Sequence, residues 1–286
     1  MPRTRALVIL LAPMATSELR SCLSTATADL DLLIAEVRAD RTRLPILFPG
    51  LPRRLGRESL ASGRRSFGGA TVDLGAFRRC DVAAAVLLLE VAATPAELWD
   101  LYAHGDMEER AMLLRSLHFL PVGASTVQMF GEVQRTNIVL HLEAAVCDGD
   151  LFVRTLGQPA FDQTTANKLL LKLAFLDLPL QRAHGAERSA NAELSRMLQD
   201  LATEREAAGR AVWRDTWRLI GRAPCPGSAA RLVGGLEHGD DGVRLAAAEG
   251  LLALNRPDLR PFAAERLDRE PREPVRAVLR RLLGRA

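Results

Sequence analysis

Apolar residues recur along most of this chain at spacings of three and four, the period of one face of an α-helix. Strict alternation of apolar and polar residues, which would indicate half-buried strands, is nearly absent. The pattern predicts helices over residues 17–38, 78–93, 95–102, 107–118, 124–147, 160–177, 189–208 and 213–221. Helix breakers separate several of them, among them Pro95 after Thr94, Pro121-Val-Gly123, Asp148-Gly149 and Pro179. The predicted fold is all-α, a helical bundle or α-solenoid of antiparallel helix pairs.

The last part of the chain has its own organisation. Ala223-Pro-Cys-Pro-Gly-Ser228 has the composition of a linker, and two similar segments follow it. In each segment a Val-Arg pair leads into an apolar helix, first Val243-Arg244 and, 32 residues later, Val275-Arg276. The two similar units resemble HEAT-like repeats, in which each helix pair buries its apolar face against the next. We therefore expect a helical domain over residues 1–222 and HEAT-like C-terminal repeats over residues 223–286, packed on it.

Residues 44–69 interrupt the helical pattern. They include three prolines, five glycines and five arginines. A loop of this length without secondary structure is usually functional or disordered. Two interpretations are open: a solvated loop, or a flap that faces an anion.

Composition limits the class of protein. No run of about 18 apolar residues is present, so we expect no membrane-spanning segment. The stretch Met1–Ala15 faintly resembles a signal peptide, but Pro13 interrupts its apolar part and no small-residue cleavage site follows. We expect a cytoplasmic protein whose first helix begins there. The four cysteines and five histidines are scattered without metal-ligand or CxxC spacing, so we expect no disulfide, no metal and no cofactor.

The basic residues are unusual because only two of the 38, Lys168 and Lys172, are lysines. A GC-rich bacterial genome explains most of this bias, so it indicates little about nucleic acid. A single tyrosine and 5% aromatic residues also leave few surfaces on which bases could stack. We expect no nucleic-acid partner.

Candidate chemistry gathers in the middle of the chain, where polar residues lie on otherwise apolar helix faces. On the helix predicted to end at residue 147, Asn137 and His141 share one stripe, and Glu143 lies on the neighbouring stripe beside small residues. On the helix predicted over residues 189–208, Arg205 lies within the apolar face and Asn191 at its margin. Such groups are either satisfied interior groups or the wall of a pocket. A buried arginine needs a partner, and we expect Glu143 to be buried with Arg205 and joined to it by a charge-assisted hydrogen bond.

The helix between these two carries both lysines, Lys168 and Lys172, at i and i+4. A desolvated lysine can act as a base, as an amine nucleophile or as an anion ligand, whereas lysines on a solvated face do none of these. Asn167 lies beside this face and serves either in packing or in hydrogen bonding. Trp213 and Trp217, four residues apart, form a stripe that is more often core than a ligand site.

Several motifs of this region resemble the EboA family. They are Arg135-Thr-Asn137, Glu143-Ala-Ala, Asn167-Lys-Leu-Leu-Leu-Lys172-Leu-Ala-Phe175, Pro179-Leu, Arg188-Ser-Ala-Asn191, Glu204-Arg205-Glu-Ala-Ala-Gly-Arg210 and Trp217-Arg-Leu. The resemblance covers roughly residues 45–221 and implies a place in a bacterial gene cluster for metabolite production and traffic. Such clusters also encode a membrane prenyltransferase, and the resemblance brings no established catalytic role. The chain departs from the family pattern at Cys147-Asp-Gly-Asp150, has Phe161-Asp where the family usually has a Trp, and lacks a Tyr expected before Glu204. Its ligand is therefore expected to differ.

Three functions remain open. The first is a non-enzymatic protein of a secondary-metabolite pathway that binds a small-molecule metabolite or docks another pathway protein, such as the membrane prenyltransferase. Its ligand-binding residues would be Asn137, Asn167, Lys168, Asn191 and Arg205. The second is a cofactor-free tailoring enzyme, a cyclase, isomerase or eliminase, with Glu143 or His141 as base and Lys172 or Arg205 stabilising an anion. The third is a structural repeat protein without a small ligand.

Overall fold

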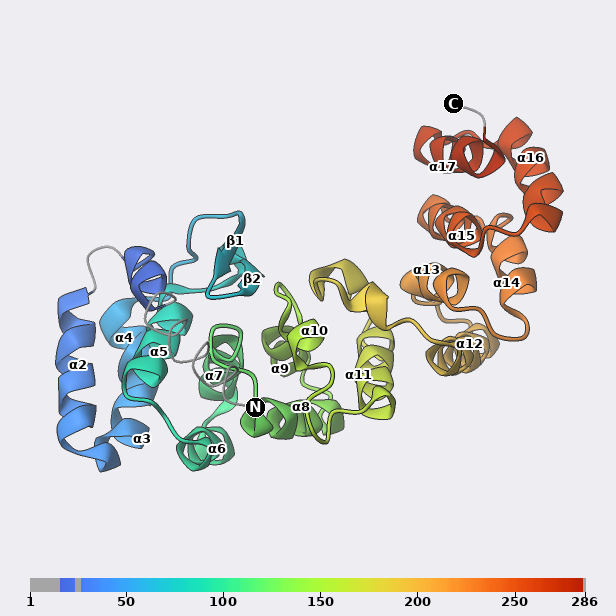
Figure 1. Cartoon of the computed structure of the whole chain (residues 1–286). Coiled ribbons are helices and arrows are strands. Elements are labelled where there is room, and N and C mark those ends of the chain that lie inside the picture. The colour runs from blue at the N-terminus through green and yellow to red at the C-terminus, as the bar shows by residue number, and fades with distance from the viewer. Residues whose placement is uncertain (1–15, 24–26, 285–286) are drawn as a thin grey trace, which may run out of the picture. The chain divides into compact units, whose positions relative to one another are not determined.

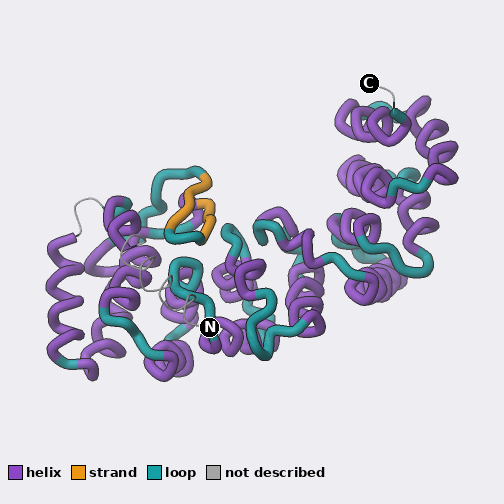
Figure 2. Tube along the Cα trace, viewed as in Figure 1, coloured by secondary structure: helices purple, strands orange, loops and turns teal. Residues whose placement is uncertain are grey.

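The computed structural model describes residues 16–23 and 27–284, and most of its regular structure is helical (Figures 1 and 2). The predicted all-α class is confirmed. The interpretation of Met1–Ala15 as the start of the first helix lies outside the described residues. Among those residues no helix has both the length and the apolar character needed to cross a membrane. The chain divides into two compact units, Met1–Asp162 with Gln181–Gly185, and Gln163–Leu180 with Ala186–Ala286.

The first unit is a set of short helices with one β-hairpin. Its elements are α2 (Thr27–Ala39), η1 (Arg41–Arg43), α3 (Leu44–Leu47), η2 (Phe48–Gly50), α4 (Leu51–Leu55), β1 (Arg64–Phe67), β2 (Ala70–Asp73), η3 (Leu74–Ala76), α5 (Arg79–Glu90), α6 (Pro95–His104), α7 (Met107–Ser116), α8 (Ala124–Arg135), α9 (Val139–Val146) and α10 (Leu151–Thr155). Helix α7 packs between α5 and α9, while α6 contacts α7 and α8 contacts α9. Capping boxes at Thr94 and Asp106 begin α6 and α7 close to the predicted positions.

Two predictions for this unit are wrong. Residues 44–69 are not a structureless loop, because their first half is helical and buries Leu44, Phe48 and Leu51 against the core. Their second half enters the hairpin, in which β1 and β2 pair antiparallel (orange in Figure 2). The helix predicted over residues 124–147 is divided into α8 and α9. The chain is extended at Thr136, whose hydroxyl accepts a hydrogen bond from the Ile138 N–H at 3.1 Å and so competes with the helical bonds.

All regular secondary structure in the described residues of the second unit is helical. Its elements are α11 (Gln163–Phe175), η5 (Ala186–Ser189), α12 (Ala192–Ala207), α13 (Asp215–Arg222), α14 (Ser228–Gly235), α15 (Asp241–Leu254), η6 (Pro257–Leu259), α16 (Arg260–Arg269) and α17 (Glu273–Leu283); the turn η4 (Leu180–Arg182) lies where the chain passes from one unit to the other. Helices α13, α15 and α17 lie side by side, and α14 and α16 pack against them (Figure 1). The helices after residue 223 share one apolar core with Trp217 and Ile220 of α13. The HEAT-like assignment and the domain boundary at residue 222 stay predictions.

The two Val-Arg pairs have equivalent positions in this unit. Arg244 Nη1 donates to the carbonyl oxygens of His238 and Gly239, and Arg276 Nη1 donates to those of Leu267 and Glu270, at 2.9–3.1 Å. Each arginine therefore satisfies backbone carbonyls that precede its own helix.

Glu270 joins the same region through a buried ion network. Its side chain is 0% exposed and accepts hydrogen bonds from Arg244, from Arg266 and from the Arg272 N–H. Burial acts to raise the pKa of Glu270, but these hydrogen bonds outweigh it and lower the pKa to about 2. The carboxylate thus stays ionised inside the unit.

Candidate functional site

Glu143, one of the two expected bases, is part of an ion network in the first unit. Arg182 donates to Glu143 Oε1 from Nη1 at 2.5 Å, and to Asp148 from Nε and Nη2 at 2.9 and 2.6 Å. The hydrogen bond to Asp148 raises the pKa of Arg182, although burial opposes this rise. The hydrogen bond to Glu143 raises the pKa further. The Glu143 carboxylate is therefore engaged by a permanent cation. The expected pair between Glu143 and Arg205 is wrong.

Three extended segments bring this network together. Gly149 forms an antiparallel bridge with Val72 and a parallel bridge with Ala183, which places Asp148 beside Arg182. A Cβ at Gly149 would come within 2.3 Å of His118 Nδ1, so a larger residue does not fit. The helix breaker Asp148-Gly149 therefore has two roles. It ends the helix, and its glycine lets the backbone pack closely against His118.

His118 and His184 lie near this network, and the sequence does not indicate either of them because no motif surrounds them. The Nε2 atom of His118 is 3.1 Å from the Ala144 carbonyl oxygen, and that of His184 is 3.2 Å from Asp73 Oδ2. Burial lowers the pKa of His118 to about 3, and the charge of Arg154 adds to this effect. His118 is therefore a neutral interior group. No three His, Cys, Asp or Glu side chains in the described ranges are placed to hold a metal ion, and the four cysteines are free thiols.

His141, the second expected base, is buried between helices. Its Nε2 atom is 3.0 Å from the carbonyl oxygen of Met107, so the imidazole links α9 to the start of α7. Burial lowers the pKa of His141, and the hydrogen bond to Met107 partly offsets this shift. Asn137, on the same predicted stripe, is exposed in the turn before α9.

Arg205 is buried in the second unit, as the apolar face of its helix predicts, but its partners are local. Its Nη1 atom donates to Asp177 Oδ1 at 2.7 Å and to the Ala211 carbonyl oxygen at 2.9 Å. Its Nη2 atom donates to the Phe175 carbonyl oxygen at 2.8 Å. The guanidinium thus ties the end of α11 to the end of α12, which is a structural role.

Asn167 and Asn191 are brought together by the structure. Each side-chain amide donates to the other's oxygen, at 3.1 and 2.7 Å, and Asn191 Oδ1 also caps α12 by accepting from the Leu194 N–H. These amides therefore join the beginnings of α11 and α12. On α11, Lys168 is exposed, whereas Lys172 is half-buried with Nζ 5.4 Å from the centre of the Phe175 ring.

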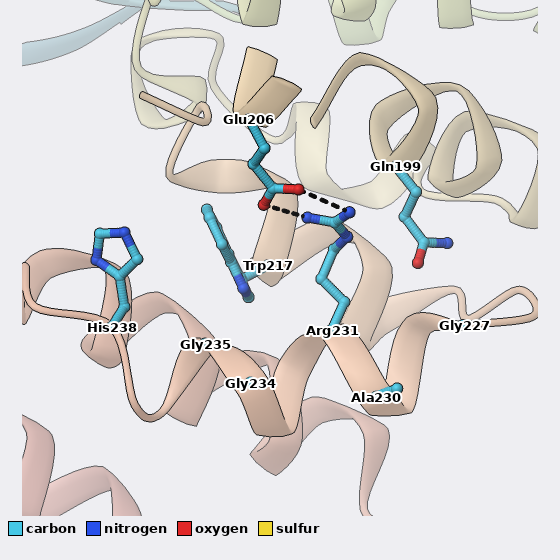
Figure 3. Close-up of a pocket in the computed structure, with 9 residues that line it drawn as sticks. All are labelled: Gln199, Glu206, Trp217, Gly227, Ala230, Arg231, Gly234, Gly235 and His238. Carbon is cyan, nitrogen blue, oxygen red and sulfur yellow. Dashed lines mark hydrogen bonds and ion pairs between the residues drawn. The ribbon is translucent and has the colours of Figure 1, made fainter. Parts of the chain in front are cut away.

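A groove of about 410 Å³ lies between α12, α13 and α14 in the second unit (Figure 3). We call it the Trp217 groove. Its lining residues are Gln199, Glu206, Trp217, Gly227, Ala230, Arg231, Gly234, Gly235 and His238. The sequence pattern places Trp217 in the core and contains no signal for Arg231 or Glu206.

Trp217 is both a core residue and a wall of this groove. The residue is 3% exposed and belongs to the apolar core of the unit. A Cβ at Gly235 would come within 2.4 Å of Trp217 Nε1, so this glycine lets α14 approach the indole closely. The buried Nε1–H has no hydrogen-bond partner among the described residues.

Arg231 and Glu206 form the charged part of the groove, beside the Trp217 ring in Figure 3. Arg231 Nη1 donates to Glu206 Oε1 at 2.7 Å, and Nη2 donates to Glu206 Oε2 at 3.3 Å and to Thr203 Oγ1 at 3.1 Å. At the other end, Gln199 Nε2 contacts the residues that precede α14, with Pro226 O at 3.4 Å. The groove therefore combines an aromatic wall with one cation and few other polar groups.

The structure is thus that of an all-α protein with an open groove in its second unit. The chain belongs to the EboA family: the family model described as "Metabolite traffic protein EboA" matches residues 79–221, which is 143 of 286 residues. This match confirms the resemblance found in the motifs. It runs from α5 to α13 and includes Gln199, Glu206 and Trp217, while Arg231 and His238 lie beyond it. No curated protein and no solved structure matches the chain.

Proposed function

We propose that this protein takes part in metabolite traffic by binding a small metabolite reversibly in the Trp217 groove. Membership of the EboA family supports the role in metabolite traffic. The observation that supports the site is the groove itself, in which the Trp217 wall lies beside the Arg231–Glu206 pair. On this proposal the protein acts in the cytoplasm of a bacterium, in a secondary-metabolite pathway.

The dimensions and chemistry of the groove suit binding. Small-molecule sites usually have volumes of about 300–1,000 Å³, apolar or aromatic walls and a few polar groups that orient the ligand. A groove of about 410 Å³ with one indole wall and one guanidinium meets this description. An open groove also allows the ligand to be released. Release is required of a protein that passes its ligand to pathway partners, including a membrane prenyltransferase.

The alternative, a cofactor-free tailoring enzyme, has no comparable support. The Glu143 carboxylate is bound by Arg182, and the His141 imidazole is bound to the Met107 carbonyl oxygen. A general base must be within reach of a substrate proton, and both groups already have partners within the fold.

The test is to see which small molecules stay on the protein when it is purified under native conditions from cells that produce it. Gly234 borders the groove, and a Cβ there would meet no heavy atom within 4 Å, so a larger side chain fits without disturbing the core. Gly234→Phe should partly fill the groove, and Gly234→Ala is the matched control because both replace glycine within α14. Native mass spectrometry should detect a bound metabolite on the wild type and on Gly234→Ala, and much less on Gly234→Phe. Equal retention by all three proteins, or a bare wild type, would overturn the proposal.

A further inference from the structure

We propose that the metabolite bound in the Trp217 groove carries a carboxylate, and that Glu206 occupies the place of this carboxylate while the groove is empty. The inference rests on the proposed function, since it assigns a ligand class to the same groove. The ligand is a small apolar acid, with its carboxylate on Arg231 and its apolar body against Trp217.

The geometry of Arg231 indicates a carboxylate rather than a generic anion. Its two terminal nitrogens face the two oxygens of Glu206, at 2.7 and 3.3 Å. This is the fork-to-fork arrangement in which guanidinium and carboxylate match one another. Arg231 is also the better-fixed partner, because its side chain is 18% exposed and Nη2 makes a further bond to Thr203.

Glu206 is held less firmly than Arg231. Its side chain is 49% exposed, and it stands one residue before the C-terminal end of α12. A negative side chain there is opposed by the negative end of the helix dipole. The Glu206 side of the pair is about half exposed to solvent, and a solvent-exposed ion pair contributes little stability. A carboxylate of the ligand can therefore replace that of Glu206 without disturbing the core.

The neighbouring surface suits an apolar body. Trp217 stands beside the ion pair in Figure 3, and Ala230, Gly234 and Gly235 add no polar side chain. The Gln199 side-chain amide already contacts the chain before α14, and His238 Nδ1 accepts from the Asp240 N–H. Arg231 is thus the strongest polar anchor in the groove.

The test compares 4-fluorophenylacetate with its neutral amide, 4-fluorophenylacetamide, by ¹⁹F NMR titration of the full chain. The wild type should bind the acid about tenfold more tightly than the amide. The acid forms a charge-assisted hydrogen bond with Arg231, whereas the amide can form only a hydrogen bond from a neutral acceptor. Glu206→Gln should tighten acid binding about threefold or more, because it removes the competing carboxylate, and should leave amide binding unchanged. Arg231→Gln should remove the preference for the acid. Glu204→Gln is the matched control: it removes an equal charge from the same helix turn, outside the lining of the groove.

Three outcomes would overturn the inference. In one outcome the amide binds as tightly as the acid, and Gly234→Phe abolishes the binding of both probes. The groove then binds ligands without selecting a carboxylate, so the proposed function holds and this inference fails. If Glu206→Gln and Glu204→Gln tighten acid binding equally, general charge explains the effect and Glu206 does not hold the ligand's place. Failure of both probes to bind any variant would count against the groove as the site.

Discussion

Replacing Glu270 by glutamine should destabilise the second unit strongly. Glu270 is fully buried and accepts hydrogen bonds from Arg244, Arg266 and the Arg272 N–H. The change removes the carboxylate partner of Arg244 and leaves Arg266 only the carboxylate of Glu237, 3.6 Å away. Removing one partner of a buried pair costs about 3–5 kcal/mol. The pKa of Glu270 gives a second measure. A shift from 4.5 in the unfolded chain to about 2 in the folded protein corresponds to about 3 kcal/mol at pH 7.

The same shift fixes the pH dependence. Because the folded-state pKa is lowered, the contribution of Glu270 is complete above pH 4.5 and is lost as the pH falls towards 2. At pH 3.5 about 1.4 kcal/mol of it should already be lost, because the unfolded carboxylate is then mostly protonated and the folded one is not. Glu270→Gln cannot lose this contribution, so its disadvantage relative to the wild type should shrink by that amount.

Urea denaturation followed by far-UV circular dichroism at pH 7 and pH 3.5 measures both quantities. The matched control is Glu265→Gln on α16, the helix that ends just before Glu270. Glu265 is 69% exposed and forms only a surface pair with Arg269 at 3.2 Å. That control should cost about 1 kcal/mol or less. The reasoning fails if Glu270→Gln costs no more than Glu265→Gln, or if its disadvantage is the same at both pH values.

Two further substitutions test the close contacts described above, each by its unfolding free energy in urea. Gly149→Ala should cost about 1–3 kcal/mol, since its Cβ would lie 2.3 Å from His118 Nδ1, and an unchanged stability would mean that the packing there is loose. Arg205→Met should cost about 1–3 kcal/mol, because two carbonyl oxygens lose their hydrogen-bond donor. The control is Arg210→Met, which replaces an exposed arginine shortly after α12 and should change stability by about 0.5 kcal/mol or less. Equal effects of the two arginine changes would remove the structural role assigned to Arg205.

The helical period was sufficient for the fold class because it depends on local spacing. It placed α5, α6, α7, α11, α12 and α13 within a few residues of their observed bounds, and it put Arg205 on a buried face. It did not show the division between α8 and α9, since one side-chain hydrogen bond at Thr136 decides it. The hairpin was missed because each strand has only four residues, too few for an alternating pattern to stand out.

The sequence pattern does not predict which side chains form ion pairs between different helices. Arg205 needed a carboxylate, and the pattern could not distinguish Glu143 from Asp177, the residue that the helix packing supplies. Arg231 and Glu206 are 25 residues apart on different helices, so nothing in either segment indicates that they meet. The expected place of Trp217 in the core is confirmed, but the approach of α14, which makes Trp217 a groove wall as well, has no signal in the sequence.

The central claim, that the Trp217 groove is where the metabolite binds, is tested most directly by the indole N–H resonances of the protein. The chain has three tryptophans, so a ¹H–¹⁵N TROSY spectrum contains three indole signals. Trp99 stacks on Tyr102 in the first unit, and Trp213 Nε1 donates to the Leu178 carbonyl oxygen, so both serve as internal references. When the small molecules released from natively purified protein are added back to the stripped protein, the Trp217 signal should shift while the other two stay in place. An unmoved Trp217 signal beside a shifted Trp99 or Trp213 signal would contradict the account.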